Sequence, residues 1–143
     1  VLPITDERMT RFWISLEQGV RFVLDCLENM LGGELFVPKI PSLNIMDLAR
    51  AIAPDCEIKD IGIRPGEKLH ELLISEDEVR YAVEFDDCFL IEPSHPWWIN
   101  NCQPGQRLSD GFRYGSDTND RWLTQDELKS MIRQVEEDLP AGD

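Results

Sequence analysis

Ile61-Gly62-Ile63-Arg64-Pro65-Gly66-Glu67-Lys68 joins a predicted strand to a predicted helix through one tight turn. Proline presets the backbone for a turn and glycine readily adopts positive φ, so we expect the chain to reverse sharply at Pro65-Gly66. The reversal directs the side chains of Arg64 and Glu67 toward one place. Because a planar guanidinium suits a phosphate and a carboxylate suits a diol, this turn is a candidate site for an anionic ligand. An ordinary surface turn ahead of a short helix has the same pattern, and the octapeptide taken alone favours that simpler interpretation.

Strands and helices alternate on both sides of this turn. A capping box, Ser15-Leu16-Glu17-Gln18, predicts a helix that spans residues 15–31 and ends at Gly32-Gly33. A second capping box, Thr124-Gln125-Asp126-Glu127, predicts a terminal helix over residues 124–138. The other predicted elements are a strand at 35–37, a helix at 45–52, a strand at 58–63, a short helix outlined by Leu69, Leu72 and Leu73, a hairpin over 83–91 and an irregular loop over 93–111. This succession predicts one α+β domain.

The length and charge of the chain limit its class. A chain of 143 residues has the size of one domain and enough apolar residues for one core. Its 28 acidic residues outnumber its 14 basic residues, which gives a formal net charge of -14. This charge opposes nonspecific binding to nucleic acid or to an anionic membrane surface. Because no apolar run is long enough to cross a bilayer, we expect neither nucleic acid nor a membrane as a partner.

The cysteines and the first residues indicate a cytoplasmic protein. The cysteines contain no Cys-x-x-Cys pair and neither histidine has a metal-ligand spacing to them, so we expect no metal and reduced, mostly structural thiols. These residues are Cys26, Cys56, Cys88, Cys102, His70 and His95. Four cysteines would also permit a secreted disulfide framework, which usually marks small, loop-rich domains. The segment Val1 to Glu7 has no methionine and no basic or apolar part of a signal peptide, so we expect the downstream part of a longer polypeptide.

The sequence carries no complete catalytic apparatus. It has no glycine-rich dinucleotide fingerprint after a strand, no phosphate loop with lysine, no Gly-x-Ser-x-Gly elbow and no His-Glu-x-x-His. Glu67 and Glu71 could serve acid–base chemistry, but acids one helical turn apart usually form a solvated face. Asp86-Asp87 could hold a cation, yet a solvated turn is the simpler interpretation without further oxygen ligands. We therefore assign no catalytic residue to this chain.

Polar or aromatic residues in three other segments are compatible with binding. Arg11, in Met9-Thr10-Arg11-Phe12-Trp13, precedes a predicted helix whose first amides favour anions, and it is the second phosphate candidate. Alone, such an arginine more often lies on the surface with its apolar stem packed. The turn from Tyr114 to Asn119 could hold a ligand or, more commonly, tie down its own backbone. Trp97-Trp98 could stack on a base, although covering the core is the safer interpretation.

Three separated segments resemble, in the right order, one enzyme family. They are Pro3-Ile4-Thr5-Asp6-Glu7-Arg8-Met9-Thr10-Arg11-Phe12-Trp13-Ile14-Ser15-Leu16, Phe36-Val37-Pro38-Lys39-Ile40-Pro41-Ser42 and Ile61-Gly62-Ile63-Arg64-Pro65-Gly66-Glu67-Lys68-Leu69-His70-Glu71. The similarity continues through Glu84 to Asp87 and from Tyr114 to Leu123, so it covers nearly the whole chain. These segments resemble the C-terminal half of the inverting UDP-N-acetylglucosamine 4,6-dehydratases. That family consists of extended short-chain dehydrogenases/reductases, and it supplies the first enzyme of the pseudaminic acid route.

The resemblance implies a fold and a division of labour. The chain would be the C-terminal substrate-binding portion of an extended short-chain dehydrogenase/reductase, and the doubly wound sheet that binds NADP would lie upstream. The helix over residues 15–31 would pack on that missing domain. The family's acid and base residues also lie upstream, so this chain alone should be inactive. The whole enzyme would convert UDP-N-acetylglucosamine to a 4-keto-6-deoxy product with inversion at carbon 5, for flagellin glycosylation, and would be a homo-oligomer.

The resemblance also assigns contacts with the UDP-sugar to residues of this chain. Arg64 and Arg11 would contact the pyrophosphate, and Glu67 would accept hydrogen bonds from the ribose hydroxyls. The strand from Pro3 to Thr5 would lie along the uracil. Met9-Thr10 would line the same pocket.

Two other kinds of function remain compatible with the sequence. A related UDP-sugar epimerase or a capsule polysaccharide dehydratase would share the nucleotide contacts and differ mainly in the sugar pocket, much of it upstream. A noncatalytic acidic interaction module would require only the observed composition. A UDP-linked thermal shift of the full-length protein distinguishes an enzyme from such a module.

Overall fold

The computed structural model describes residues 1–95 and 105–138 as a mixture of helices and short strands. The helices are α1 (Leu16–Asn29), α2 (Ile45–Ile52), α3 (Gln125–Asp138) and a 3-10 helix at Val79–Tyr81. The strands are β1 (Leu2–Ile4), β2 (Thr10–Phe12), β3 (Leu35–Pro38), β4 (Ser42–Asn44), β5 (Ile58–Asp60), β6 (Leu72–Ile74), β7 (Ala82–Glu84), β8 (Cys88–Ile91), β9 (Gln106–Arg107) and β10 (Tyr114–Gly115). The predicted roles of Trp97-Trp98 fall outside the described residues, as does Cys102.

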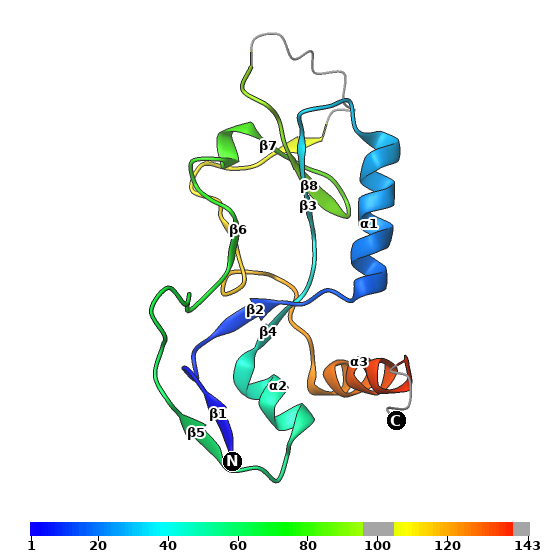
Figure 1. Ribbon diagram of the computed structural model, residues 1–143. Coiled ribbons are helices and arrows are strands. Elements are labelled where there is room, and N and C mark those ends of the chain that lie inside the picture. The colour runs from blue at the N-terminus through cyan, green and yellow to red at the C-terminus, as the bar shows by residue number, and fades with distance from the viewer. Residues whose placement is uncertain (96–104, 139–143) are drawn as a thin grey trace.

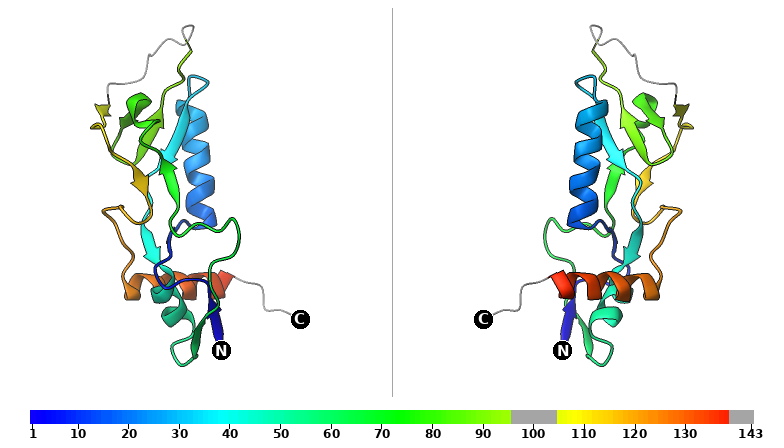
Figure 2. Two further views of the ribbon diagram at one scale, coloured as in Figure 1. Left: turned by 90° about the vertical axis from the view of Figure 1, so that its left-hand side faces the viewer. Right: turned by 90° about the vertical axis from the view of Figure 1, so that its right-hand side faces the viewer.

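The strands form one larger sheet and three small pairs (Figure 1). The larger sheet is antiparallel and has the order β3-β8-β7-β9. β2 pairs with β4 and β10 pairs with β6, both antiparallel, whereas β1 and β5 form a parallel pair. In Figure 2, α1 runs alongside the larger sheet, and α3 lies near α2 toward the other end of the molecule. The prediction of a mixed helix-and-strand domain is confirmed.

Two groups of buried apolar side chains hold these elements together. One group joins the larger sheet to the β6–β10 pair and contains Val37, Ile74, Ala82, Phe89 and Tyr114. The other joins α2, α3 and β4. Its buried members are Leu43, Leu123 and Leu128. The site described below involves the β1–β5 pair and β2, which pairs with β4 of this second group.

The predicted helix starts are confirmed in atomic detail. Ser15 accepts from the Gln18 backbone N–H at 3.1 Å, and its own N–H donates to the Gln18 side chain at 3.0 Å. Thr124 and Glu127 form the second capping box with the same reciprocal pattern. α1 ends at Asn29, two residues earlier than predicted, because Met30 adopts an extended conformation. Positive φ then follows at Gly32 and Gly33.

The predicted hairpin and the state of three cysteines are also confirmed. β7 and β8 pair antiparallel, and the Phe85 N–H donates to the Cys88 carbonyl at 2.9 Å, which places Asp86-Asp87 in the turn. Cys26, Cys56 and Cys88 are free thiols. Burial, chiefly, raises the pKa of Cys88 to about 11, so this thiol is protonated at neutral pH.

Three sequence predictions need correction. The prediction of a short helix outlined by Leu69, Leu72 and Leu73 is wrong, because residues 72–74 form β6 and pair with β10 about 40 residues later in the chain. The strand predicted over 58–63 ends at Asp60, since the chain turns away at Gly62 with a φ of 79°. Of the loop predicted over 93–111, residues 96–104 lie outside the described residues, and the described part contains a short strand, β9, which pairs with the edge of β7.

Candidate functional site

The candidate site lies at the carboxyl ends of the parallel strands β1 and β5. Leu2 is opposite Ile58 and Ile4 is opposite Asp60, and the Ile61 N–H extends the pairing to the Ile4 carbonyl at 2.8 Å. Thr5 and the segment from Ile61 to Lys68 therefore leave the two strands at the same end. Carboxyl ends of parallel strands commonly carry ligand sites, because the loops that follow them converge there.

The Pro65-Gly66 turn has the tight geometry that the sequence predicts. The Glu67 N–H donates to the Arg64 carbonyl at 3.0 Å, and Gly66 has a φ of 83°, which a residue with a Cβ rarely adopts. The Gly62 N–H donates to Oδ1 of Asp60 at 2.8 Å, which fixes the chain where it enters the turn. The turn is thus held at both ends before any ligand arrives.

The carboxylate of Glu67 links the turn to β1. Its Oε1 accepts from the Thr5 hydroxyl at 3.1 Å, and its Oε2 accepts from the Arg64 backbone N–H at 3.1 Å. The hydrogen bond from that N–H lowers the pKa of Glu67, with further lowering from the Thr5 hydroxyl and from the charges of Arg64 and Arg11. Glu67 is therefore an ionised acceptor whose oxygens retain lone pairs for hydroxyl groups of a ligand.

The guanidinium of Arg64 is exposed at the tip of the turn. Among residues 1–95 and 105–138, no hydrogen bond or ion pair of the Arg64 side chain is formed, so its fork is available to an anion. The turn thus carries one cation that is unengaged among the described residues and one carboxylate held by two hydrogen bonds.

The guanidinium of Arg11, in contrast, is engaged by the protein itself. Its Nη1 donates to the carbonyls of Thr10 at 2.7 Å and Leu69 at 3.2 Å, and its Nη2 donates to the Lys68 carbonyl at 3.0 Å. Nη2 also lies 3.5 Å from Met9 Sδ, and Nε lies 3.6 Å from a carboxylate oxygen of Glu71. Arg11 therefore fastens the segment that follows the turn to β2.

The remaining predicted contact residues lie at different depths. Pro3 is exposed on β1, whereas Met9 and Thr10 are buried, with 2% and 5% of their surface exposed. The Thr5 hydroxyl lies 3.1 Å from Met9 Sδ as well as from Glu67. Met9 and Thr10 thus lie in the interior next to the site, and the Thr5 side chain links β1 to the turn.

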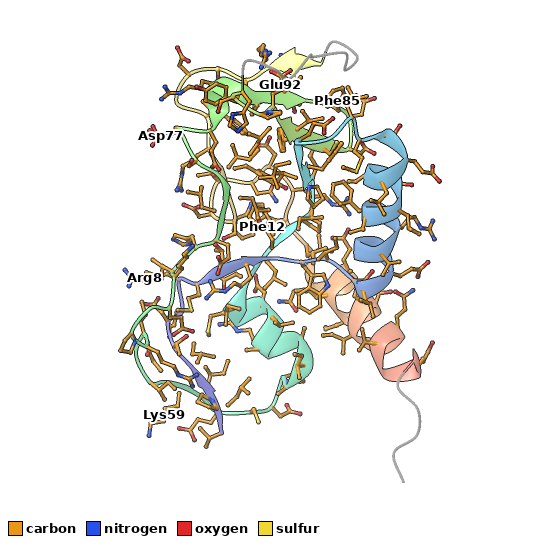
Figure 3. All side chains as sticks on the ribbon, turned by 45° about the horizontal axis from the view of Figure 1, so that its top comes forward. Arg8, Phe12, Lys59, Asp77, Phe85 and Glu92 are labelled. Atoms are coloured by element: carbon orange, nitrogen blue, oxygen red, sulfur yellow. The ribbon has the colours of Figure 1, made fainter. Side chains whose placement is uncertain are left out.

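A neighbouring ion pair was not anticipated from the sequence. The Arg8 guanidinium binds both carboxylate oxygens of Asp6 at 3.0 and 2.7 Å, and this hydrogen bonding lowers the pKa of Asp6 to about 2. In Figure 3, Arg8 points outward from this end of the molecule, whereas Phe12 lies in the interior. Since its charge is matched by Asp6, Arg8 is a natural comparison for Arg64.

The turn from Tyr114 to Asn119 ties down its own chain, which was the more common of its two sequence interpretations. The buried Tyr114 hydroxyl bonds both the N–H and the carbonyl of Ile40, at 2.9 and 3.0 Å. The Asn119 amide donates to the same carbonyl at 2.8 Å. These hydrogen bonds join the turn to the segment that precedes β4.

The described residues contain neither a metal-ligand cluster nor a membrane-spanning helix. No group of three or more His, Cys, Asp or Glu side chains between residues 1–95 and 105–138 is arranged to hold a metal ion. Over the same ranges, every helix is too short or too polar to span a bilayer.

Comparisons with known proteins agree on one family. Residues 1–93 match the family model described as polysaccharide biosynthesis protein. The chain is 51% identical over 143 residues to the inverting UDP-N-acetylglucosamine 4,6-dehydratase of Campylobacter jejuni, which covers 94% of this chain and 43% of the relative. It is 40% identical over 95 residues to a UDP-glucose 4-epimerase of Rickettsia conorii, which covers 64% of this chain and 28% of the relative. The X-ray structure of Pen from Bacillus thuringiensis superposes with a TM-score of 0.77 at 29% identity, over 94% of this chain and 41% of that one. The chain thus spans less than half the length of these relatives.

Proposed function

The chain belongs to the polysaccharide biosynthesis protein family, and from this premise we propose that it is the UDP-sugar-binding part of an inverting UDP-N-acetylglucosamine 4,6-dehydratase. The observation that carries the proposal is the 51% identity to the Campylobacter dehydratase over 94% of the chain. The turn geometry supports it, because an unengaged guanidinium and an ionised carboxylate stand at the end of a parallel strand pair.

The residues of the site suit the parts of a nucleoside diphosphate. Arg64 would bind the pyrophosphate, because a guanidinium fork matches two phosphate oxygens. Glu67, held by Thr5 and by the Arg64 N–H, would accept from the ribose hydroxyls with its remaining lone pairs. The edge of β1 away from β5, at Pro3 and Thr5, would offer backbone groups to the uracil. Met9, Thr10 and Arg11 would hold these elements from beneath.

The chemical step would belong to residues beyond this chain. The described residues include no glycine-rich turn between a strand and a helix, which supports placing the dinucleotide site outside them. NADP, which would carry the hydride, would be bound by an upstream half together with the acid and base residues. In this division, the present chain binds and orients the UDP-sugar, and it is inactive alone.

A stripe of exposed apolar side chains on α1 would contact the upstream half. The stripe follows helical spacing, and 52–85% of the surface of each of its members is exposed. It comprises Leu16, Val20, Val23, Leu24 and Leu27. An apolar patch this continuous is unusual on a monomer surface, which supports the assignment of α1 to a domain interface. The complete protein would be a cytoplasmic homo-oligomer that serves pseudaminic acid synthesis and flagellin glycosylation.

A UDP-sugar 4-epimerase is the second candidate, because such enzymes would share the nucleotide contacts. The extent of similarity favours the dehydratase. The epimerase of Rickettsia conorii aligns with 64% of this chain, whereas the Campylobacter dehydratase aligns with 94%. Product analysis separates the two, since a dehydratase releases water and leaves a 4-keto-6-deoxy sugar, whereas an epimerase returns a 4-hydroxyl.

Calorimetry of UDP binding to the complete enzyme tests the proposal. Arg64→Ala should weaken binding by about 1.5 to 3 kcal/mol, the scale of a charge-assisted hydrogen bond, or roughly 10- to 150-fold. Arg8→Ala is the matched control, because its charge is already paired with Asp6, and it should leave the affinity within about twofold. Equal effects of the two substitutions on UDP affinity would show that Arg64 is an ordinary surface residue of the turn. Residues 1–143 alone should form no 4-keto product with UDP-N-acetylglucosamine and NADP, and sustained turnover would contradict the division of labour.

A further inference from the structure

A polar cluster lies beside the segment that follows the turn and consists of Thr10, His70, Glu71 and Ser116, of which Thr10 and Ser116 are buried and His70 and Glu71 are half-buried. Ser116 is completely buried, and 5% of the surface of Thr10 is exposed. Thr10 Oγ1 lies 2.7 Å from Ser116 Oγ and 2.8 Å from His70 Nδ1. The Glu71 N–H donates to Ser116 Oγ at 2.9 Å, and the Ser116 N–H donates to the Glu71 carbonyl at 2.8 Å. One serine near the end of the chain thus bonds both β2 and the segment that follows the turn.

The hydroxyl protons of this cluster have two consistent arrangements. In the first, Ser116 donates to the Thr10 carbonyl at 3.1 Å, Thr10 donates to Ser116 Oγ, and His70 Nδ1–H donates to Thr10 Oγ1. In the second, Thr10 donates to His70 Nδ1, and Ser116 donates to Thr10 Oγ1. The tautomer or charge of His70 selects between them. Ser116 stays bonded to Thr10 and Glu71 in both, so its oxygen is needed whichever proton arrangement holds.

The cluster is continuous with the groups that hold the turn. Thr10 precedes Arg11, and the Thr10 N–H donates to the Leu69 carbonyl at 3.1 Å. The Arg11 guanidinium binds the carbonyls of Lys68 and Leu69. Residues 68–71 are therefore clamped to β2 by Arg11 from one side and by Ser116 from the other. The Arg64–Glu67 turn ends directly before this clamped segment.

We infer that Ser116 is a positioning residue for the UDP-sugar, acting through Thr10 and Glu71 on the Arg64–Glu67 turn; this rests on the proposed function. Ser116 lies 45 residues from Glu71 and 106 residues from Thr10 in the sequence. Its hydroxyl therefore helps to hold β2 and the segment after the turn at a fixed separation, although the two are far apart along the chain. Removing its hydroxyl leaves the Glu71 N–H and the Thr10 carbonyl without this partner. The clamp on this side is then weakened, because only the backbone hydrogen bond from the Ser116 N–H to the Glu71 carbonyl still joins Ser116 to this segment.

Positioning and simple stabilisation give different kinetic signatures. A residue that only stabilises the fold changes the fraction of active enzyme, which lowers the apparent kcat and leaves the KM of the surviving molecules unchanged. A residue that holds the nucleotide-binding turn changes ground-state and transition-state binding alike, which raises KM and leaves kcat unchanged. Ser42 provides the matched control, because it is also completely buried and accepts a hydrogen bond, from the Asn119 amide at 3.0 Å, but has no contact with the turn.

The test compares Ser116→Ala with Ser42→Ala in the complete enzyme, using steady-state kinetics and calorimetry with UDP. Ser116→Ala should raise KM for UDP-N-acetylglucosamine and Kd for UDP by about tenfold, the scale of one lost buried hydrogen bond, with kcat within twofold. Ser42→Ala should lower the melting temperature without changing either constant. If Ser116→Ala does not fold, Thr10→Val keeps the side-chain shape, removes the hydroxyl and should show the same rise in KM. Unchanged KM and Kd in whichever of these two variants folds would overturn the inference, whereas failure of the unsubstituted enzyme to bind UDP would overturn the proposed function instead.

Discussion

Replacing Tyr114 by phenylalanine isolates one hydroxyl that joins two distant parts of the chain. The Tyr114 ring lies 4.8 Å from Phe12 and 4.9 Å from Phe89 between centroids, and phenylalanine keeps both contacts. The hydroxyl accepts from the Ile40 N–H and donates to the Ile40 carbonyl. Burial raises the pKa of Tyr114 above its usual value, so the hydroxyl remains protonated and able to donate at neutral pH.

The structure sets the size of the expected loss. The Ile40 carbonyl keeps the Asn119 amide at 2.8 Å, so only the Ile40 N–H loses its partner. An unsatisfied donor in a protein interior costs about 1 to 3 kcal/mol, and Ile40 is only partly buried, which favours the lower half of that range. We therefore expect Tyr114→Phe to lower the free energy of unfolding by about 1 to 2 kcal/mol, or the melting temperature by roughly 3 to 8 °C.

Urea unfolding followed by circular dichroism measures this loss. Tyr81→Phe is the control, since 41% of Tyr81 is exposed, and its free energy of unfolding should change by less than about 0.5 kcal/mol. Asn119→Ala combined with Tyr114→Phe strips both partners from the Ile40 carbonyl, so the double variant should lose more than the sum of the single losses. A Tyr114→Phe protein as stable as the unsubstituted one, or strictly additive losses, would refute this reasoning.

Three further substitutions or titrations probe the turn and the core. Gly66→Ala should weaken UDP binding by the complete enzyme, because a φ of 83° costs a residue with a Cβ about 1 to 2 kcal/mol. As a control, Gly19→Ala inside α1 should stabilise the chain slightly. Equal melting temperatures and equal UDP affinities of the two variants would contradict this prediction. The pKa of Glu67 is lowered in the folded chain, so the stability that its carboxylate adds to the turn is present above the pKa of the unfolded chain and is lost as pH falls through the lower folded value. In a nuclear magnetic resonance titration, the amide shifts of Thr5 and Arg64 should therefore change together only under acidic conditions. A midpoint at or above the ordinary glutamate pKa would refute this prediction. Leu128 lies on α3, is fully buried and packs in the second core group, so Leu128→Ala should lower the free energy of unfolding by about 2 to 5 kcal/mol. Val135→Ala, at an exposed position, should lower it by less than about 0.5 kcal/mol. Comparable losses in the two variants would show that the second core group is loosely packed.

Elements whose signals are local could be predicted from the sequence. The starts of α1 and α3 follow from Ser15 with Gln18 and from Thr124 with Glu127, pairs that lie three residues apart and bond as expected. The Pro65-Gly66 turn is equally local, since proline and glycine fix its dihedral angles without help from the rest of the fold. These features need no knowledge of distant residues.

Elements that depend on distant partners could not be predicted in the same way. The leucines at 69, 72 and 73 have helical spacing, yet residues 72–74 are extended because the 114–115 segment offers them a strand partner. Helical periodicity over so few residues is weak compared with a ladder of backbone hydrogen bonds, and tertiary pairing overrides it. The same limit applies to Ser116, whose partners Thr10 and Glu71 are 106 and 45 residues away.

The two arginines of the site show why residue type alone does not fix a role. In the sequence, Arg64 on its turn was the first phosphate candidate, and Arg11, among apolar residues before a predicted helix, was the second. In the fold, the Arg11 guanidinium donates hydrogen bonds to the carbonyls of Thr10, Lys68 and Leu69, and these bonds hold the segment that follows the turn. A phosphate could bind Arg11 only if it replaced the neutral carbonyls as hydrogen-bond acceptors. The new bond would be charge-assisted, but the segment after the turn would lose its hydrogen bonds to Arg11. Among the described residues Arg64 forms no such bond, so under the proposed function we expect Arg64 to make the first contact with a pyrophosphate and Arg11 to add its charge from behind the turn.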